Sequence, residues 1–236
     1  MQLKKISDIQ GQIELVSGLH IGSGNTEMHI GGTDNPVIKN PVSGEPYIPG
    51  SSLKGKMRSL LEWRAGVVGI TDGKPLGFRH LSGLQGESEV RGRSILKLFG
   101  GAPEGGGGDD RAVREIGPTR LAFWDCALDP MWVKEMRDKN LLLTETKMEN
   151  MIDRIAGVAE HPRNTERVPA SARFDFRLTV KVIDSDDLLA DILRGLRLLE
   201  LTGIGGSGSR GYGKLRFTAL SLDGGSLMEQ LAAAEV

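Results

Sequence analysis

The sequence has 236 residues, of which 39% are hydrophobic and 26% charged, a composition typical of a soluble globular protein with one large domain or two small ones. Its net charge of −1 argues against a globally basic nucleic-acid-binding protein, so any nucleic-acid site must come from local clusters of Lys and Arg. The single cysteine, Cys126, excludes an intrachain disulfide and a multi-cysteine zinc site, and it indicates a reducing, cytoplasmic compartment.

The N-terminal part lacks the apolar run of a signal peptide, and no run of about 18 apolar residues predicts a membrane span. Residues 9–19 alternate between apolar and polar side chains, which predicts a half-buried strand ending at His20. After a loop rich in Pro and Gly, Ser51 or Ser52 is predicted to cap a helix over residues 52–66. The apolar stripe of that helix comprises Leu53, Met57, Leu60, Leu61 and Ala65.

Another face of the same helix carries Lys54 and Arg58, which are four residues apart. Gly55 lies between them, and glycine inside a helix costs about 1 kcal/mol relative to alanine. We therefore expect the helix backbone at Gly55 to be approached closely by another group.

The middle of the chain is less regular. Residues 66–118 predict little regular structure apart from a helix near 93–100, and the glycine-rich stretch 100–110 is expected to be a mobile loop. A strand is predicted over residues 119–126. Residues 127–172 then form a long, charge-rich excursion with helix-like and turn-like parts.

The C-terminal part gives the clearest patterns. Residues 173–183 alternate as a strand, residues 186–201 carry the apolar stripe of a helix, and residues 214–222 form a last strand. The order of strand, helix, strands, helix and strand predicts an α+β fold, namely a ferredoxin-like βαββαβ unit, which is the framework of an RNA-recognition motif. We expect one such domain over residues 1–236.

The stretch TGIGGSGSRGYGKL, residues 202–215, carries six glycines between Gly203 and Gly213. It fits G-x-G-x-x-G and part of a P-loop, but those motifs run strand, loop, helix, whereas this loop follows a helix and precedes a strand. A helix C-cap needs only Gly203. The further glycines expose backbone N–H groups that can hold anions, and their spread along the loop favours a phosphodiester chain over a mononucleotide.

Several segments, taken together, resemble the RAMP superfamily of CRISPR-associated proteins, and in particular the repeated backbone subunit of type III-A (Csm) interference complexes. They are the glycine loop, GLHIGSG, GGTDNPVIKNPVSGEPYIPGSSLKGKMRSLLE, KLFG, and TKMENMIDRIAGVAEHPRNTERV at 146–168. The resemblance spans most of residues 9–217. It implies a modified RNA-recognition fold with a lid-like insertion at 66–118 and a thumb-like hairpin within 127–172.

The resemblance also implies a function. Copies of the subunit stack along a guide RNA, a thumb displaces nucleotides at regular intervals, and each copy cuts the complementary target RNA with Mg²⁺ or another divalent metal. Other type III effector subunits are expected as partners. The matching catalytic residue is Asp34, which is also the one candidate metal ligand. From the residues alone, an Asx-turn before Asn35-Pro36 is the favoured explanation of Asp34, and the resemblance reverses that preference.

The residues expected to bind RNA come from four segments. His20 matches a guide-contacting histidine, although a structural role or a general base is an alternative. The second segment is the helix predicted over 52–66, whose N-terminal N–H groups and nearby cations can bind phosphates. In the thumb, apolar side chains with a basic flank are expected to part base steps, unless they pack on the domain. The predicted contacts are His20, Ser51, Ser52, Lys54, Arg58, Met151, Arg154, Gly206, Ser207, Gly208, Ser209 and Arg210.

Three alternatives remain open at this point. A structural subunit would bind RNA without cutting it, whereas a guide-processing ribonuclease of the same superfamily would use His20 as a base and need no metal. A nucleotide-binding enzyme would bind ATP or NAD in the absence of RNA. No zinc is predicted, since Cys126 has no cysteine partner.

Overall fold

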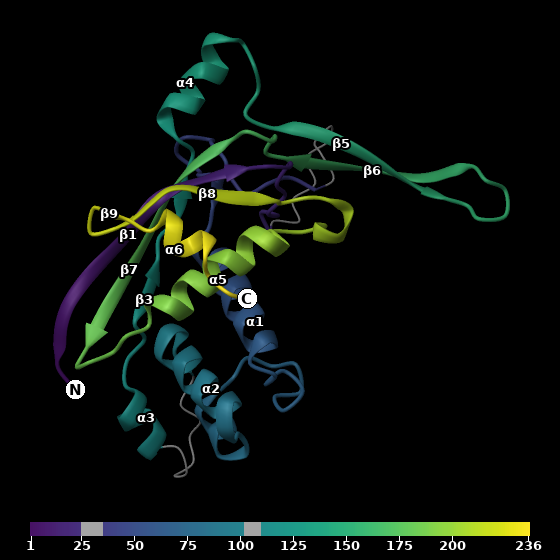
Figure 1. Ribbon diagram of the computed structural model, residues 1–236. Helices are drawn as coiled ribbons and strands as arrows, with labels where there is room; N and C mark the ends of the chain where they lie inside the picture. Colours follow the sequence, from purple (N-terminus) through teal and green to yellow (C-terminus); the bar gives the residue numbers. More distant parts are fainter. Residues whose placement is uncertain (25–34, 102–109) are drawn as a thin grey trace.

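The computed structural model describes residues 1–24, 35–101 and 110–236, and its centre is a five-stranded antiparallel sheet (Figure 1). The strands lie in the order β3, β7, β1, β8, β9. Their bounds are β1 Leu3–Leu15, β3 Leu121–Phe123, β7 Arg173–Ile183, β8 Leu215–Leu222 and β9 Gly225–Ser226. The strands predicted over 9–19, 173–183 and 214–222 are therefore confirmed, although the first begins earlier and ends at Leu15.

Alternation along the central strands divides the sheet into a buried and an open face. Ile9 and Ile13 of β1 pair with Leu178 and Phe174 of β7, and all four side chains are buried. Their buried face packs against α1 (Gly50–Arg64) and α5 (Leu189–Thr202). The predicted helix at 186–201 is thus confirmed with a start shifted to Leu189, and both helices contribute to one continuous core.

The start of α1 differs from the prediction. The N-cap is Pro49, which has no capping side chain, so Ser51 and Ser52 lie in the first turn instead of before it. The Gly50 N–H is satisfied from a distant part of the chain, because it donates to Asp125 Oδ1 at 2.7 Å. Apart from its own stretch of helix, no described atom lies within 4 Å of where a Gly55 side chain would begin, so the close approach expected there is not made by the described part of the fold.

The predicted strand 119–126 is split. Its first part is β3, which pairs with β7, whereas Cys126 and Ala127 form β4 and pair with β2 (Tyr47–Ile48). Between the two parts lies Asp125, whose Oδ1 accepts the Gly50 N–H at the start of α1. Cys126 is fully buried, and this burial raises the pKa of its thiol to about 12.

Residues 66–118 contain more helix than predicted. They form a 3₁₀ helix at Phe78–Gly83, α2 at Gly86–Phe99 and α3 at Asp110–Ile116. The predicted mobile loop falls mostly on residues 102–109, which lie outside the described residues.

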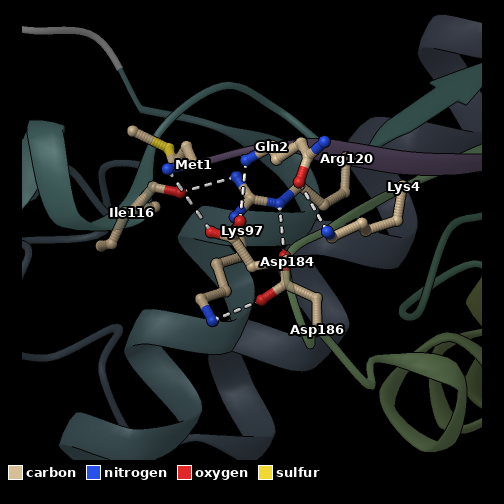
Figure 2. A network of polar contacts seen from close by, with 8 residues as sticks. All are labelled: Met1, Gln2, Lys4, Lys97, Ile116, Arg120, Asp184 and Asp186. Carbon is tan, nitrogen blue, oxygen red and sulfur yellow. Dashed lines mark hydrogen bonds and ion pairs between the residues drawn. The ribbon is translucent and has the colours of Figure 1, made fainter.

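A buried charge network joins this region to the sheet (Figure 2). The Arg120 side chain is 2% exposed and donates to Asp186 Oδ2 at 2.8 Å and to the Ile116 carbonyl at 2.6 Å. Lys97 Nζ donates to the other oxygen of Asp186 at 2.7 Å. Burial alone would raise the pKa of the Asp186 carboxyl, but the hydrogen bonds from Lys97 and Arg120 outweigh it and hold that pKa below its ordinary value.

Residues 127–172 contain α4 (Pro130–Asp138), β5 (Glu145–Ile152) and β6 (Ala159–Arg167). β5 and β6 pair into a hairpin that projects away from the body of the protein (Figure 1). After β8 and β9 the chain ends with α6 (Met228–Ala232), which packs beside α5. Among the described residues, no helix has the length and apolar character needed to cross a membrane.

Candidate nucleic-acid interface

The glycine loop between α5 and β8 lies against the segment that follows β1. Gly206 N–H donates to the His20 carbonyl at 2.9 Å, and Gly213 N–H donates to the Gly18 carbonyl at 2.9 Å. Gly205 and Gly213 have φ values of +75° and +69°, and a Cβ on Gly205 would lie 2.4 Å from the His20 oxygen. Some of the glycines predicted to approach RNA are therefore required by the protein's own backbone.

The outer part of the loop is open. Within the described chain, the backbone N–H groups of Ser207, Gly208 and Ser209 have no hydrogen-bond acceptor, and Gly208 has open space around it. Arg210 follows, with its guanidinium bonded to Ser207 Oγ at 2.5 Å and its side chain 54% exposed. Successive N–H groups beside a cation are the chemistry that binds phosphate oxygens.

His20 is held in one orientation beside this loop. Its Nδ1 lies 2.7 Å from the Glu166 carbonyl oxygen, which can only accept a hydrogen bond, so Nδ1 carries a proton. The other ring nitrogen, Nε2, has no hydrogen-bond partner among the described residues. The structure therefore brings the predicted contact His20 together with the predicted contacts at Gly206–Arg210.

Glu166, on β6, ties this region to the segment after Asp34. Its carboxylate accepts from Val37 N–H at 2.9 Å, from Lys39 Nζ at 2.6 Å and from Thr144 Oγ1 at 2.8 Å. Burial alone would raise the pKa of the Glu166 carboxyl, but these hydrogen bonds outweigh it and hold that pKa below its ordinary value. Asp34 itself lies outside the described residues.

The base of the hairpin meets the glycine loop around a buried tyrosine. Tyr212 is 1% exposed, and its hydroxyl donates to Glu149 Oε1 at 3.1 Å. Lys147 Nζ lies 4.6 Å from the centre of the Tyr212 ring, and Arg167 Cζ lies 5.0 Å from it. Cations over an aromatic face attract it, so β5, β6 and the loop are joined at this point.

The far end of the hairpin exposes apolar side chains. Met151 is 53% exposed and Ile155 is fully exposed, and Arg154 lies exposed between them in sequence. This end does not pack on the domain, which was one of the two interpretations left open by the sequence. Apolar side chains without a partner in the described fold are available to a ligand.

The first turn of α1 is a separate feature. Ser51 is exposed, Ser52 and Lys54 are half-buried, and Lys54 has no ion-pair partner in the described chain. Arg58 is instead engaged within the fold, because its Nε donates to Glu62 Oε1 at 2.8 Å and its guanidinium to the Leu76 carbonyl at 2.5 Å. No hydrogen bond or ion pair between described residues joins this turn to the glycine loop.

A metal centre is not evident in the parts of the chain that the structure describes. Residues 1–24, 35–101 and 110–236 contain no group of three or more His, Cys, Asp and Glu side chains placed to hold a metal ion. The described residues therefore do not by themselves fit a divalent metal. Asp34 lies outside these ranges.

Sequence reasoning missed Glu149, Glu166 and Tyr212 as parts of this region. Glu149 and Glu166 lie in the segment 146–168, and Tyr212 lies within the glycine loop, so each belongs to a stretch already singled out. Their partners, however, are up to 146 positions away along the chain, as for Glu166 and His20. Only the folded arrangement identifies these contacts.

Comparison with known proteins identifies the class. A model of one protein family, described as the RAMP superfamily, matches residues 12–216. The chain therefore belongs to the RAMP superfamily.

More particular similarities lie within that superfamily. The chain is 40% identical over 236 residues to the CRISPR system Cms endoribonuclease Csm3 of Methanothermobacter thermautotrophicus, an alignment that covers 94% of this chain and 87% of the relative. It is 38% identical over 218 residues to the protein of the same description from Enterococcus italicus, covering 91% of both.

The solved structures agree with these relatives. The chain resembles the crystal structure of a Csm3–Csm4 subcomplex of the type III-A CRISPR-Cas interference complex, with a TM-score of 0.55 and 27% identity over 94% of this chain and 80% of that one. The resemblance to backbone subunits of type III-A complexes, inferred from the glycine loop and four other segments, is confirmed. The mixed α/β architecture with an antiparallel sheet is likewise that of these structures.

Proposed function

We propose that the chain is a guide-RNA-binding subunit of a type III CRISPR ribonucleoprotein, which stacks with further copies of itself and cuts complementary target RNA at regular intervals. The observation that carries the proposal is the row of free N–H groups at Ser207–Ser209 beside Arg210, on a loop fixed against His20. Such a row suits successive phosphates of a strand. The relatives' description as endoribonucleases supports the cutting, and the Csm3–Csm4 subcomplex supports partner subunits.

The finer description of the fold belongs to this proposal. The sheet order β3, β7, β1, β8 and the helices α1 and α5 support a ferredoxin-like βαββαβ unit made of β1, α1, β3, β7, α5 and β8. The unit forms a single domain over residues 1–236 with insertions at 66–118, as a lid, and 127–172. The hairpin β5–β6 is the proposed thumb.

The thumb's proposed role follows from its exposed end. Met151 enters between stacked bases, at about a few kcal/mol for each step parted, and Arg154 contacts the neighbouring phosphates. A nucleotide displaced from the stack has a freer backbone, which can reach the in-line geometry that attack on its phosphate needs. The hairpin thereby selects the position of cutting.

Binding of the guide is assigned to the protein's own groups. His20 Nε2, the N–H groups at 207–209 and Arg210 bind the backbone, with Gly206 and Gly208 leaving room for it. Ser51, Ser52 and Lys54, in the first turn of α1, hold a further phosphate. Arg58 stays a prediction, since its guanidinium already bonds Glu62 and Leu76.

Cutting is assigned to Asp34, which orients the ribose 2′-OH or binds a divalent metal through water. A metal such as Mg²⁺ would supply positive charge to the phosphate under attack. This assignment rests on the family and on the place of Asp34 directly before Asn35, whose carbonyl accepts from Glu166 N–H at 3.1 Å.

The test compares Asp34→Ala with Asp187→Ala, which removes an exposed aspartate that has no ion pair in the described structure. Each variant is assembled with guide RNA, and cleavage of a complementary strand is followed with Mg²⁺ and with EDTA. We expect Asp34→Ala to lose cutting by at least about 10²-fold while keeping guide RNA, since a positioned catalytic group contributes that much. Normal cutting by Asp34→Ala would leave a non-cleaving RNA-binding role, and metal-independent cutting of precursor RNA would instead support guide processing.

A further inference from the structure

A single carboxylate on the hairpin holds the arginine of the glycine loop. Glu149 lies in the middle of β5. Its Oε2 accepts a hydrogen bond from the Arg210 guanidinium at 2.6 Å, although the two residues are 61 positions apart. The Glu149 side chain is 17% exposed and that of Arg210 is 54% exposed. The carboxylate is thus partly buried, and the cation it holds is at the surface.

Glu149 is fixed from several sides. Tyr212 donates its hydroxyl to Oε1 at 3.1 Å, Lys147 Nζ lies 3.3 Å from the same oxygen, and the backbone of Glu149 pairs with Arg163 in the hairpin ladder. Burial alone would raise the pKa of the Glu149 carboxyl, but the hydrogen bonds from Lys147 and Tyr212 and the charge of Arg210 outweigh it and hold that pKa below its ordinary value. The group therefore stays ionised and in place at neutral pH.

Arg210 has donors left over in this arrangement. A guanidinium has five N–H donors, and the described bonds use it only toward Glu149 and Ser207. Arg210 directly follows Ser207, Gly208 and Ser209, whose backbone N–H groups have no acceptor in the described chain. Resting on the proposed function, we propose that Glu149 is a positioning residue that presets Arg210 for an RNA phosphate.

This proposal predicts that RNA affinity changes in the direction opposite to that expected from charge alone when Glu149 is removed. RNA is an anion, so removing a nearby negative charge should tighten its binding by Coulomb's law. If Glu149 instead holds Arg210 in its bound orientation, removing the charge frees a long side chain, and the entropy of ordering it must then be supplied on binding. Loss of Glu149 then weakens RNA binding.

The test uses the full chain and a mixed-sequence single-stranded RNA, with affinity measured at several salt concentrations. The variants are Glu149→Gln, Arg210→Gln and the pair together, and Glu160→Gln is the matched control. Glu160 lies on the same hairpin, is exposed and has no described ion pair. Its replacement by Gln therefore removes one negative charge without breaking an ion pair. Thermal denaturation of each variant shows whether the fold is kept.

We expect Glu149→Gln to weaken RNA binding about fivefold to tenfold, as expected for one preorganised charge-assisted contact. The salt dependence of log K should stay that of the native chain in Glu149→Gln, because the Arg210 contact still forms, and it should fall by about 0.7 in Arg210→Gln, which loses one phosphate contact on a single strand. The double variant should bind no more weakly than Arg210→Gln alone, because Glu149 acts only through Arg210. Tyr212→Phe, which removes one anchor of Glu149, should cause a smaller loss and serves if Glu149→Gln folds poorly.

The outcomes separate this inference from the proposed function. If Arg210→Gln weakens binding while Glu149→Gln and Tyr212→Phe bind like the native chain or more tightly, the positioning role is overturned and the RNA site stands. If Arg210→Gln leaves binding unchanged, the assignment of the glycine loop to RNA fails, and the role of Glu149 fails with it. An equal loss of affinity in Glu160→Gln would show that the effect is not specific to the carboxylate that holds Arg210, and it would also overturn the inference.

Discussion

Replacement of Gly213 by alanine should displace the glycine loop from the body of the protein and lower the free energy of unfolding. Gly213 has a φ of +69°, and an added Cβ would lie 1.8 Å from the Ile204 carbonyl oxygen, which is backbone and cannot swing away. A non-glycine residue in left-handed conformation costs about 1–2 kcal/mol, and moving the neighbouring backbone costs about 1–3 kcal/mol more. The sum of about 2–5 kcal/mol is a large part of the roughly 5–15 kcal/mol that stabilises a typical domain.

Thermal denaturation measures this effect against Gly208→Ala, which lies in the same loop, faces open space and has no positive φ. At about 2–4 °C for each kcal/mol in a chain of this size, Gly213→Ala should melt roughly 4–20 °C lower. Gly208→Ala should change the free energy of unfolding by less than about 0.5 kcal/mol. Equal melting of the two variants would refute the argument that the protein's own backbone, rather than RNA, requires the inner glycines.

The other predictions concern separate parts of the fold. Glu166→Gln should loosen Lys39 and Val37 from β6 and reduce target cleavage at least about tenfold in a cleavage assay, because charge-assisted bonds to one carboxylate are lost. Asp186→Asn should lower the free energy of unfolding by about 3 kcal/mol at neutral pH, since it strands the buried Arg120 charge. This loss of stability should become smaller in urea melts below pH 3.8. The pKa of the Asp186 carboxyl is lower in the folded than in the unfolded chain, so its ionised form stabilises the fold above the unfolded pKa, and that stabilisation is lost as the pH falls through the folded pKa. Met151→Asp should leave the melting temperature unchanged but weaken binding to a guide–target duplex, and a full native affinity would contradict the wedge role.

The main strands and helices could be predicted because their patterns are local. Alternation at Ile9 and Ile13, and along residues 173–183, reports directly which face of a strand is buried. The helical stripe of α5 is equally plain in the sequence. In contrast, the strand predicted at 119–126 is split where Asp125 accepts the Gly50 N–H, 75 positions away, and no local pattern encodes that bond.

The segments that form the candidate site could be predicted, but the contacts between them could not. The glycine loop was singled out from its composition and His20 from the family resemblance, and the structure places them in contact. The sequence suggested Ser51 or Ser52 as a cap because serine commonly caps helices, but the Gly50 N–H is already satisfied by a side chain from elsewhere. Arg58 reads as a solvated cation; its ion pair with Glu62 has the local spacing of four residues and was missed, whereas its bond to the Leu76 carbonyl, 18 positions away, has no local signal.

The burial of Cys126 makes the chain convenient for site-specific labelling. A thiol that is fully buried, with a pKa of about 12, is almost wholly protonated near neutral pH and reacts poorly with maleimides. Because the sequence has no other cysteine, one introduced as Ile155→Cys at the fully exposed end of the hairpin would be the single reactive thiol. A fluorophore at that position would report the movement of the hairpin in solution without any need to remove the native cysteine.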